Sequence, residues 1–497
     1  MRGTVNVFRR AGFHSKVLLI IGVIIAVPAL VVIFYPEELR YLPAFLIPAG
    51  FIIAFGLALA LVTQREAAPD RRVYQSPIRN GSLSVLFAWV CAMLAGAVPF
   101  VISGQLSCFE ALFESVSGWT TTGLSISDVT EIPRVFLFHR TFMQYCGGLG
   151  FIIVIAVVLQ GKQITSMYNA EGHPDGIMPS VRRAAITILS IYMGCLAIGT
   201  VLFSIFGMPV FDAICHAMSA LATAGVSTHS SGLGGYTSLP IELVAVVLMF
   251  VGGSNFAVLM LITQRRFKRV VKISEVRFMA CSFAVFVPLM MIPLIQRGGM
   301  SFFRSLREAV FCVVAMFTTS GYYISDYSLW PPFAVLLIML LMILGASTGS
   351  TAGGIKMLRA YIVLRVTKEN IRRRLSPNHS VRVMHYMRPN GEAPIHNDLI
   401  RDTFEFVTVY FVLLVAGTLL ITLFENCSLG TAAFEFTAAF GTIGVSNGLT
   451  AGASTPSLIV LMAGMFMGRL EIYILFIGMH TMYRKVKGAL LGSRSAD

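Results

Sequence analysis

The sequence predicts an all-α integral membrane protein, built from four related helical units that follow two additional N-terminal helices. Three observations support this fold class. Of the 497 residues, 56% are hydrophobic and only 12% are charged, about half the share of charge that is usual in a soluble domain. The hydrophobic residues come in blocks long enough to cross a bilayer. A short threonine/glycine tract recurs at four places along the chain.

Six hydrophobic blocks run for about 18 to 22 residues without a lysine or arginine, close to the ~20 helical residues that cross a hydrocarbon core. The first block is too long, and too close to the second, to be a cleaved signal peptide, so we expect it to be retained as a helix. The blocks cover residues 17–35, 42–62, 84–102, 186–206, 241–262 and 407–424.

The basic residues that give the net charge of +14 are distributed along the chain as in a membrane protein. With the amino terminus inside, 31 of the 38 lysines and arginines fall in inner segments, six fall outside, Arg140 among them, and Arg469 lies within a hydrophobic segment. This asymmetry is the positive-inside rule. It predicts a multi-pass protein of the cytoplasmic (inner) membrane with both termini in the cytoplasm. The basic residues then face the lipid bilayer surface, and no nucleic-acid partner is predicted.

Four short tracts, each ending in glycine, mark an internal repeat. Their glycines are 102, 96 and 123 residues apart, and an alanine stands twelve residues before each. Sixteen residues before the glycines stand Ser107, Pro209, Ser305 and Ser428. The tracts are Thr121-Thr122-Gly123, Thr223-Ala224-Gly225, Thr319-Ser320-Gly321 and Thr442-Ile443-Gly444.

The upstream residues predict a short helix before each tract. Ser107 with Glu110, and Ser305 with Glu308, match the S-x-x-E capping box, and Pro209 with Asp212 also suits a helix start. From cap to tract such a helix measures ~20 Å at ~1.5 Å per residue, too short to span a membrane. Four re-entrant loops around one axis would aim four negative helix ends and four sets of carbonyls at one cation site. The alternative is that the tracts are ordinary small-residue packing motifs.

The repeat divides the chain into five parts. The two N-terminal helices and a basic inner loop occupy residues 1–80. The first unit is expected over 81–183, the second over 184–276, the third over 277–400 with a broken second helix and a basic inner loop, and the fourth over 401–497 with a basic tail.

Two further features suggest a gate. A run of glycine, alanine, serine and threonine over residues 345–354 forms a poor helix, and we expect an intramembrane loop below the tracts; a close-packed helix interface is the alternative. Arg469 would lie about twelve residues into the last hydrophobic helix, where a charge is costly and a functional role is the default, although a structural ion pair is possible. The expected gate residues are Gly345, Ser347, Thr348, Gly349, Ser350, Gly353, Gly354 and Arg469.

Other motifs do not carry enzyme chemistry. Residues 345–349 match G-x-S-x-G, but that motif needs a strand-to-helix turn with an acid and a base. Residues 349–356 resemble a phosphate loop, but Ile355 separates glycine from lysine. His216 could titrate or be a packed histidine, and the role of Glu471 is open.

At these residues the chain resembles the Trk/Ktr/HKT superfamily of potassium transporters, and within it the Trk membrane subunit. The resemblance covers nearly the whole chain. It includes Gly147-Gly148-Leu149-Gly150, the run 345–356 and Gly468-Arg469-Leu470-Glu471-Ile472. Two helices before the first unit are also typical of the Trk branch.

The resemblance implies potassium uptake through a gated, selective pore, with potassium as substrate, no covalently bound cofactor and no enzymatic activity. It implies a homodimer with one pore per protomer and a cytosolic regulatory subunit with nucleotide-binding RCK domains. The twelve tract residues would form the selectivity filter. Only the third tract keeps an aromatic residue, Tyr322, after its glycine, so we expect one well-formed ion site.

Two alternatives stay open. Sodium or ammonium could permeate instead, although sodium-selective relatives carry serine where this chain has Gly123. An intramembrane hydrolase would need a Ser-His or Asp-Asp pair at matched depth, and no such pair stands out.

Overall fold

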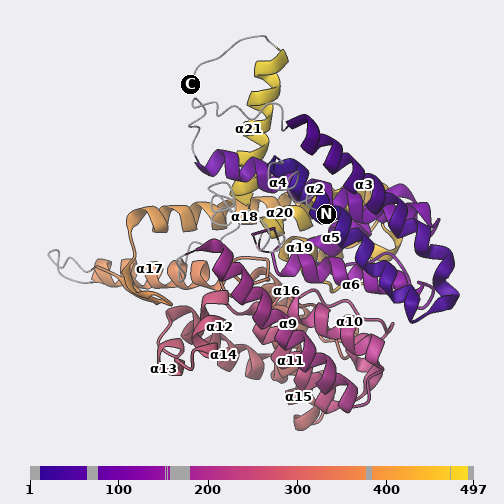
Figure 1. Cartoon of the computed structure of the whole chain (residues 1–497). Helices are drawn as coiled ribbons and strands as arrows, with labels where there is room; N and C mark the ends of the chain where they lie inside the picture. The colour runs from indigo at the N-terminus through magenta and orange to yellow at the C-terminus, as the bar shows by residue number, and fades with distance from the viewer. Residues whose placement is uncertain are drawn as a thin grey trace.

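The computed structural model describes residues 12–63, 77–150, 153, 155–156, 180–375, 383–470 and 472–490, and its regular structure is almost entirely helical. Six of the described helices are long and apolar enough to cross a membrane, and two bent helix pairs pass the same test together. Figure 1 shows the helices gathered in a bundle, with α2 (Phe13–Ala26) and α3 (Leu42–Thr63) together at its edge. The predicted all-α membrane fold is confirmed.

The N-terminal hairpin packs against the first unit. α2 continues into the 3-10 segment η1 (Val27–Ile33), and η2 (Pro36–Tyr41) leads into α3. Glu38 in η2 accepts hydrogen bonds from the backbone N–H groups of Arg134 (2.7 Å) and Val135 (2.8 Å), at the start of α6. A carboxylate at a helix N-terminus satisfies orphan donors and interacts favourably with the helix dipole. Glu38 therefore fixes the N-terminal helices to the first unit.

Each of the four units begins with a long helix and continues with a short one. The short helices have 12 to 16 residues, too few to cross a hydrocarbon core. The long helices are α4 (Pro77–Ile102), α9 (Val181–Ile205), α14 (Ser274–Gln296) and α18 (Asn397–Phe424); the short ones are α5 (Cys108–Trp119), α10 (Val210–Leu221), α15 (Phe302–Phe317) and α19 (Leu429–Gly441).

After its tract, each unit has a second helix that breaks or ends within two residues of a glycine. The helix direction bends by 112° between α11 and α12, and by 105° between α20 and α21. A break was predicted only in the third unit. The second helices are α6 (Arg134–Gly148), α11 (Leu239–Gly253) with α12 (Phe256–Thr263), α16 (Pro332–Ile343) with α17 (Met357–Leu375), and α20 (Thr455–Leu470) with α21 (Ile472–Leu490).

One predicted continuous helix is therefore wrong. The block 241–262 is interrupted because Ser254 is extended and the Asn255 side chain accepts from the Ala257 N–H (2.7 Å), which caps a new helix. Arg469, expected about twelve residues into the last hydrophobic helix, lies in the last turn of α20, which ends at Leu470. Glu471 lies outside the described residues.

One predicted helix start is also wrong. The capping box of Ser107 and Glu110 is present in α5, and Ser428 caps α19. The third short helix, α15, instead begins one turn early, with Ser301 at its N-cap. Ser305 is therefore buried inside the helix, and Glu308 turns to accept from Ser325 Oγ (2.8 Å).

The chain between the third and fourth units adds a small β-hairpin that the sequence did not predict. β1 (His385–Arg388) pairs antiparallel with β2 (Gly391–Pro394).

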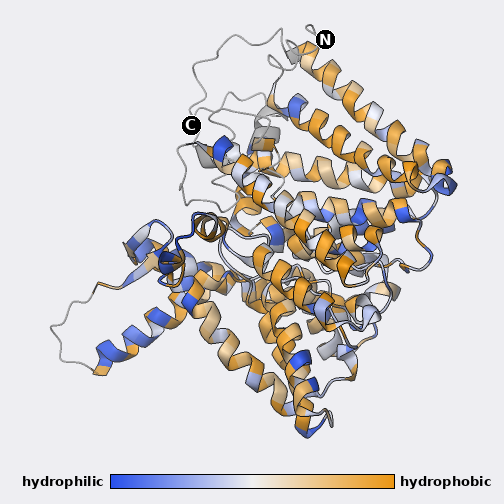
Figure 2. Ribbon diagram, turned by 60° about the horizontal axis from the view of Figure 1, so that its bottom comes forward, coloured by the Kyte–Doolittle hydropathy of each residue, from blue (hydrophilic) through white to orange (hydrophobic). Residues whose placement is uncertain are grey.

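Two further helices lie outside the repeated pattern or extend beyond the bundle. A short helix, α13 (Phe267–Val270), connects the second unit to α14 of the third. Figure 2 shows hydrophobic residues throughout the bundle and hydrophilic ones along α17, which projects from it at the lower left. This basic arm ends in Arg372, Arg373 and Arg374.

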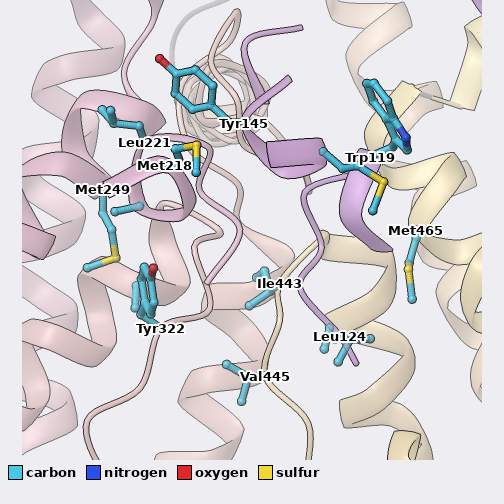
Figure 3. Packing of buried hydrophobic residues seen from close by; sticks show 14 of the residues in the cluster. Trp119, Leu124, Tyr145, Met218, Leu221, Met249, Tyr322, Ile443, Val445 and Met465 are labelled. Atoms are coloured by element: carbon cyan, nitrogen blue, oxygen red, sulfur yellow. The ribbon is translucent and has the colours of Figure 1, made fainter. Parts of the chain in front are cut away.

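A single hydrophobic core joins the four units around the tracts. Figure 3 shows Ile443 and Val445, on either side of the fourth tract glycine, between Tyr322 of the third unit and Leu124 of the first. All four side chains are at most 5% exposed. The tracts thus pack on side chains from several units at once.

Candidate ion pathway

The four tracts touch one another in a closed ring. Glycine permits this close approach, since an added Cβ would meet the backbone of the next tract. A Cβ placed on Gly123 would overlap Ala224 O, one on Gly225 would overlap Ser320 O, and one on Gly321 would overlap Gly444 N. A Cβ placed on Gly444 would lie 2.8 Å from Thr122 O. The order is first, second, third, fourth and back to first, so tracts far apart in sequence surround one axis.

The first residue of every tract is a threonine in the left-handed region. Its φ lies between 52° and 57° in all four tracts. This conformation is a genuine outlier for a β-branched residue and costs on the order of 1–3 kcal/mol. Such strain persists only where the surroundings impose it, and it gathers at functional sites. The residues are Thr121, Thr223, Thr319 and Thr442, all fully buried.

A cavity of about 750 Å³ opens on the glycine side of the ring. Its walls include Gly123, Gly225 and Gly444 and the two carboxylates of Asp128 and Asp326. The Thr130 backbone N–H (2.9 Å) and hydroxyl (2.8 Å) donate to Asp128 and lower its pKa, which keeps this carboxylate ionised. Negative charge in a concave wall raises the local concentration of cations.

The glycine-rich loop, residues 344–356 between α16 and α17, lies on the threonine side of the ring. The Gly353 N–H donates to Thr319 Oγ1 (3.1 Å), and the hydroxyls of Thr351 and Thr223 are 2.7 Å apart. A Cβ on Gly353 would overlap Thr442 Oγ1. The loop therefore contacts three of the four tracts. It is an irregular loop, as predicted, and not a helix interface.

The loop has a closed neck and is held from several sides. The Gly345 N–H donates to Ile355 O, and the Ile355 N–H to Ile343 O, both at 2.9 Å. The second unit binds it where α11 breaks: the Ser347 N–H donates to Gly253 O (3.2 Å). From α14, Glu275 Oε1 accepts from the Thr348 N–H (2.6 Å). These contacts satisfy backbone groups that would otherwise be costly to bury.

Arg469 joins the loop to the first unit. Its guanidinium donates to Thr351 O and also to Gly147 O (2.6 Å) and Gly148 O (3.3 Å), where α6 ends. Its Cζ lies 6.0 Å from the ring centre of Trp89. Bridging carbonyls of two segments uses the fork of donors that only arginine carries. The structure thus places the predicted gate residues in one contact network.

A second set of residues stands nine positions before each tract glycine, and sequence reasoning had singled out only His216 among them. These are Glu114, His216, Cys312 and Glu435, and all four are buried. Glu114 also forms a buried ion pair with Arg140 (3.1 Å), which the charge count had placed at the outer surface. His216 is hydrogen bonded at both ring nitrogens, to Asp212 O (2.8 Å) and Ser227 Oγ (2.9 Å), so it is a packed histidine. Aligning the four glycines at this offset would have exposed the two glutamates.

Among the described residues, no group of three or more His, Cys, Asp or Glu side chains is arranged to hold a metal ion. What the ring offers is oxygen: tract carbonyls and threonine hydroxyls. The hydroxyls of Thr121 and Thr442 are buried with no hydrogen-bond partner among the described residues. Oxygen ligands from carbonyls and hydroxyls suit alkali cations that shed their hydration shell.

A family model described as "TrkH: Cation transport protein" matches residues 49–302 and 299–483. The chain belongs to the TrkH family. It is similar to the Trk system potassium uptake protein TrkG of Escherichia coli K12, with 28% identity over 91% of this chain and 94% of that protein. It is also similar to the Trk system potassium uptake protein TrkH of Halomonas elongata, with 26% identity over 87% and 90% of the two chains.

A solved structure agrees with this assignment. The crystal structure of the potassium transporter TrkH from Vibrio parahaemolyticus has a TM-score of 0.80 and 25% identity, and covers 94% of this chain and 98% of that one. This TrkH-family member is therefore a multi-pass membrane transport protein and not an enzyme. The predicted family is confirmed.

Proposed function

We propose that this protein takes up potassium across the cytoplasmic membrane through a gated, potassium-selective pore. The observation that carries the proposal is the order of elements along one axis: an acidic cavity, a closed ring of four tracts, and a loop against the ring's far side. The printed names of the relatives, potassium uptake proteins, support the choice of ion.

The twelve tract residues named above are the proposed filter. Tract carbonyls and threonine hydroxyls would replace the hydration shell of the ion. Glycine at all four final positions allows the backbones to approach. Ion preference is tested with purified protein in liposomes, by comparing potassium, sodium and ammonium flux. Growth of a potassium-uptake-deficient bacterium on low-potassium medium is the companion test. Equal flux of all three ions would contradict the proposal.

The glycine-rich loop and Arg469 are the proposed gate. The loop fills the exit below the ring, and Arg469 fastens it to Gly147 and Gly148. A positive charge below a cation filter also opposes cation passage. Opening requires the loop to move away from the ring. The loop continues directly into α17, so a movement of α17 outside the bundle would pull on the loop.

Arg469→Ala tests the gate. Losing the charged hydrogen bonds should raise potassium flux at least about tenfold, since each is worth roughly 1.5–3 kcal/mol and a tenfold change needs about 1.4 kcal/mol. Arg469→Lys keeps the charge but loses the fork, and should give an intermediate flux. Arg297→Ala, at an exposed arginine, is the matched control. Folded Arg469→Ala protein with the parental flux would contradict this role.

We also propose a homodimer with both termini in the cytoplasm and a cytosolic regulatory subunit with nucleotide-binding RCK domains. The resemblance to the Trk branch supports both, and the basic arm of α17 offers a charged surface for the subunit. Cross-linking of the purified protein should yield a dimer. A pull-down should retain a subunit of this class, more weakly as salt rises.

A further inference from the structure

The position nine residues before each tract glycine contacts the chain that follows the tract. In the first unit, Glu114 Oε1 accepts from Ser125 Oγ (2.7 Å) and from the Ile126 (2.9 Å) and Ser127 (3.3 Å) N–H groups. Ser127 Oγ donates to the same oxygen (3.1 Å). One buried carboxylate oxygen on α5 thus holds the segment just beyond Gly123.

The fourth unit repeats this arrangement. Glu435 Oε1 accepts from Ser446 Oγ and from the N–H groups of Leu449 (3.0 Å) and Thr450 (3.2 Å). Ser446 stands two residues after its tract glycine, as Ser125 does. The two carboxylates therefore bind corresponding segments in two units separated by more than 300 residues.

In the second and third units, other side chains hold the segment that follows the tract. His216 Nε2 is 2.9 Å from the hydroxyl of Ser227, again two residues after the glycine. The third unit has Cys312 at this position, but Tyr322 follows its glycine and donates to Val226 O (3.1 Å) and His216 O (3.2 Å) of the second unit. In every unit a buried polar group ties the chain beyond the tract to a short helix.

We propose that Glu435, Glu114 and His216 are positioning residues that hold the outer ends of the tracts and thereby set the ion preference of the ring. The inference rests on the proposed function. It follows from geometry: each tract is fixed at its inner end by its short helix and at its outer end by this contact. Because neighbouring tracts are in backbone contact, a released outer end changes the spacing of the oxygens that face the ion.

Glu435 is the better site for a test than Glu114. Glu114 is paired with buried Arg140, and removing one partner of a buried pair leaves a charge uncompensated and strongly destabilises the fold. No ion pair to Glu435 is found in the described part of the chain, and its Oε2 has no hydrogen-bond partner there. Glutamine can therefore keep the accepting oxygen while removing the charge.

The experiment measures the ratio of potassium to sodium flux in liposomes. Glu435→Ala should lower the ratio at least about fivefold, the effect of losing about one hydrogen bond, while potassium flux persists. Glu435→Gln should stay within about twofold of the parent, because its amide oxygen can accept the same donors. Glu131→Ala, at an exposed carboxylate of the outer loop, should leave the ratio unchanged.

Two results would overturn the inference: folded Glu435→Ala with the parental ratio, or Glu435→Gln as impaired as Glu435→Ala. The second would show that charge, not anchoring, matters. Should Glu435→Ala not fold, Ser446→Ala removes one of the three hydrogen bonds to Glu435, from an exposed residue, and should lower the ratio in the same direction by a smaller factor. A parent that conducts sodium as well as potassium overturns the proposed function, whereas the inference is judged by the change from the parent.

Discussion

The third unit differs from the other three where its second helix breaks. In the first, second and fourth units a glycine near the end of α6, α11 or α20 packs against a carbonyl at the end of the unit's own short helix. A Cβ placed on Gly147 would overlap Trp119 O, one on Gly252 would overlap Leu221 O, and one on Gly468 would overlap Phe440 O. In the third unit the corresponding glycine, Gly345, packs instead against Gly353 O of its own loop.

This difference distinguishes a fixed frame, made of the first, second and fourth units, from the third unit, which carries the proposed gate loop. Three units lock the second helix directly to the short helix that positions a tract, so those helices cannot shift without disturbing the ring. The third unit places a loop with a closed neck at this point, held by hydrogen bonds from the second and fourth units and from α14 of its own unit. The proposed gate motion would therefore displace the loop and leave the four tracts in contact.

The largest effect is expected from Gly147→Ala. Its Cβ would overlap the backbone of Trp119, which cannot yield as a flexible side chain could, so α5 and α6 must move apart. We expect a loss of about 1–3 kcal/mol or more, seen as a lower melting temperature or loss of monodisperse protein. Gly194→Ala is the control, since nothing lies within 4 Å of its Cβ position. A parental melting temperature for Gly147→Ala would contradict the frame.

Gly345→Ala should behave differently although its clash is as close. The overlapping atom, Gly353 O, belongs to the loop, so the loop is displaced and the ring is not. We expect folded protein whose potassium flux exceeds that of the parent several-fold, measured in liposomes without any partner subunit. Loss of folding comparable with Gly147→Ala would erase the distinction between the third unit and the rest.

Sequence reasoning located the elements but not their contacts. Repeated tracts and a run that cannot form a helix are local signals, and each indicated its element correctly. The left-handed threonines gave no such signal, because threonine disfavours that conformation and adopts it only under tertiary constraint.

The missed contacts have one physical cause: they join residues brought together by the fold. Arg140 was assigned to the outer side because basic residues were counted segment by segment, and only folding shows its partner Glu114. Ser305 matched a capping box that the chain does not use, since Ser301 starts the helix one turn earlier. Local patterns indicate what a segment can do, and packing decides among the options.

The smallest effect is expected from Thr351→Val, which sharpens the comparison within the loop itself. The Thr351 hydroxyl donates to Gly252 O (2.9 Å) and lies 2.7 Å from that of Thr223, while its carbonyl binds Arg469. Valine keeps the branched shape and the carbonyl and removes only the hydroxyl. Closed-state stability should fall by about 1 kcal/mol in all, so flux should rise by a few-fold at most, less than in Arg469→Ala. An effect equal to that of Arg469→Ala would mean that the hydroxyl contact with the second tract, and not the arginine, holds the loop closed.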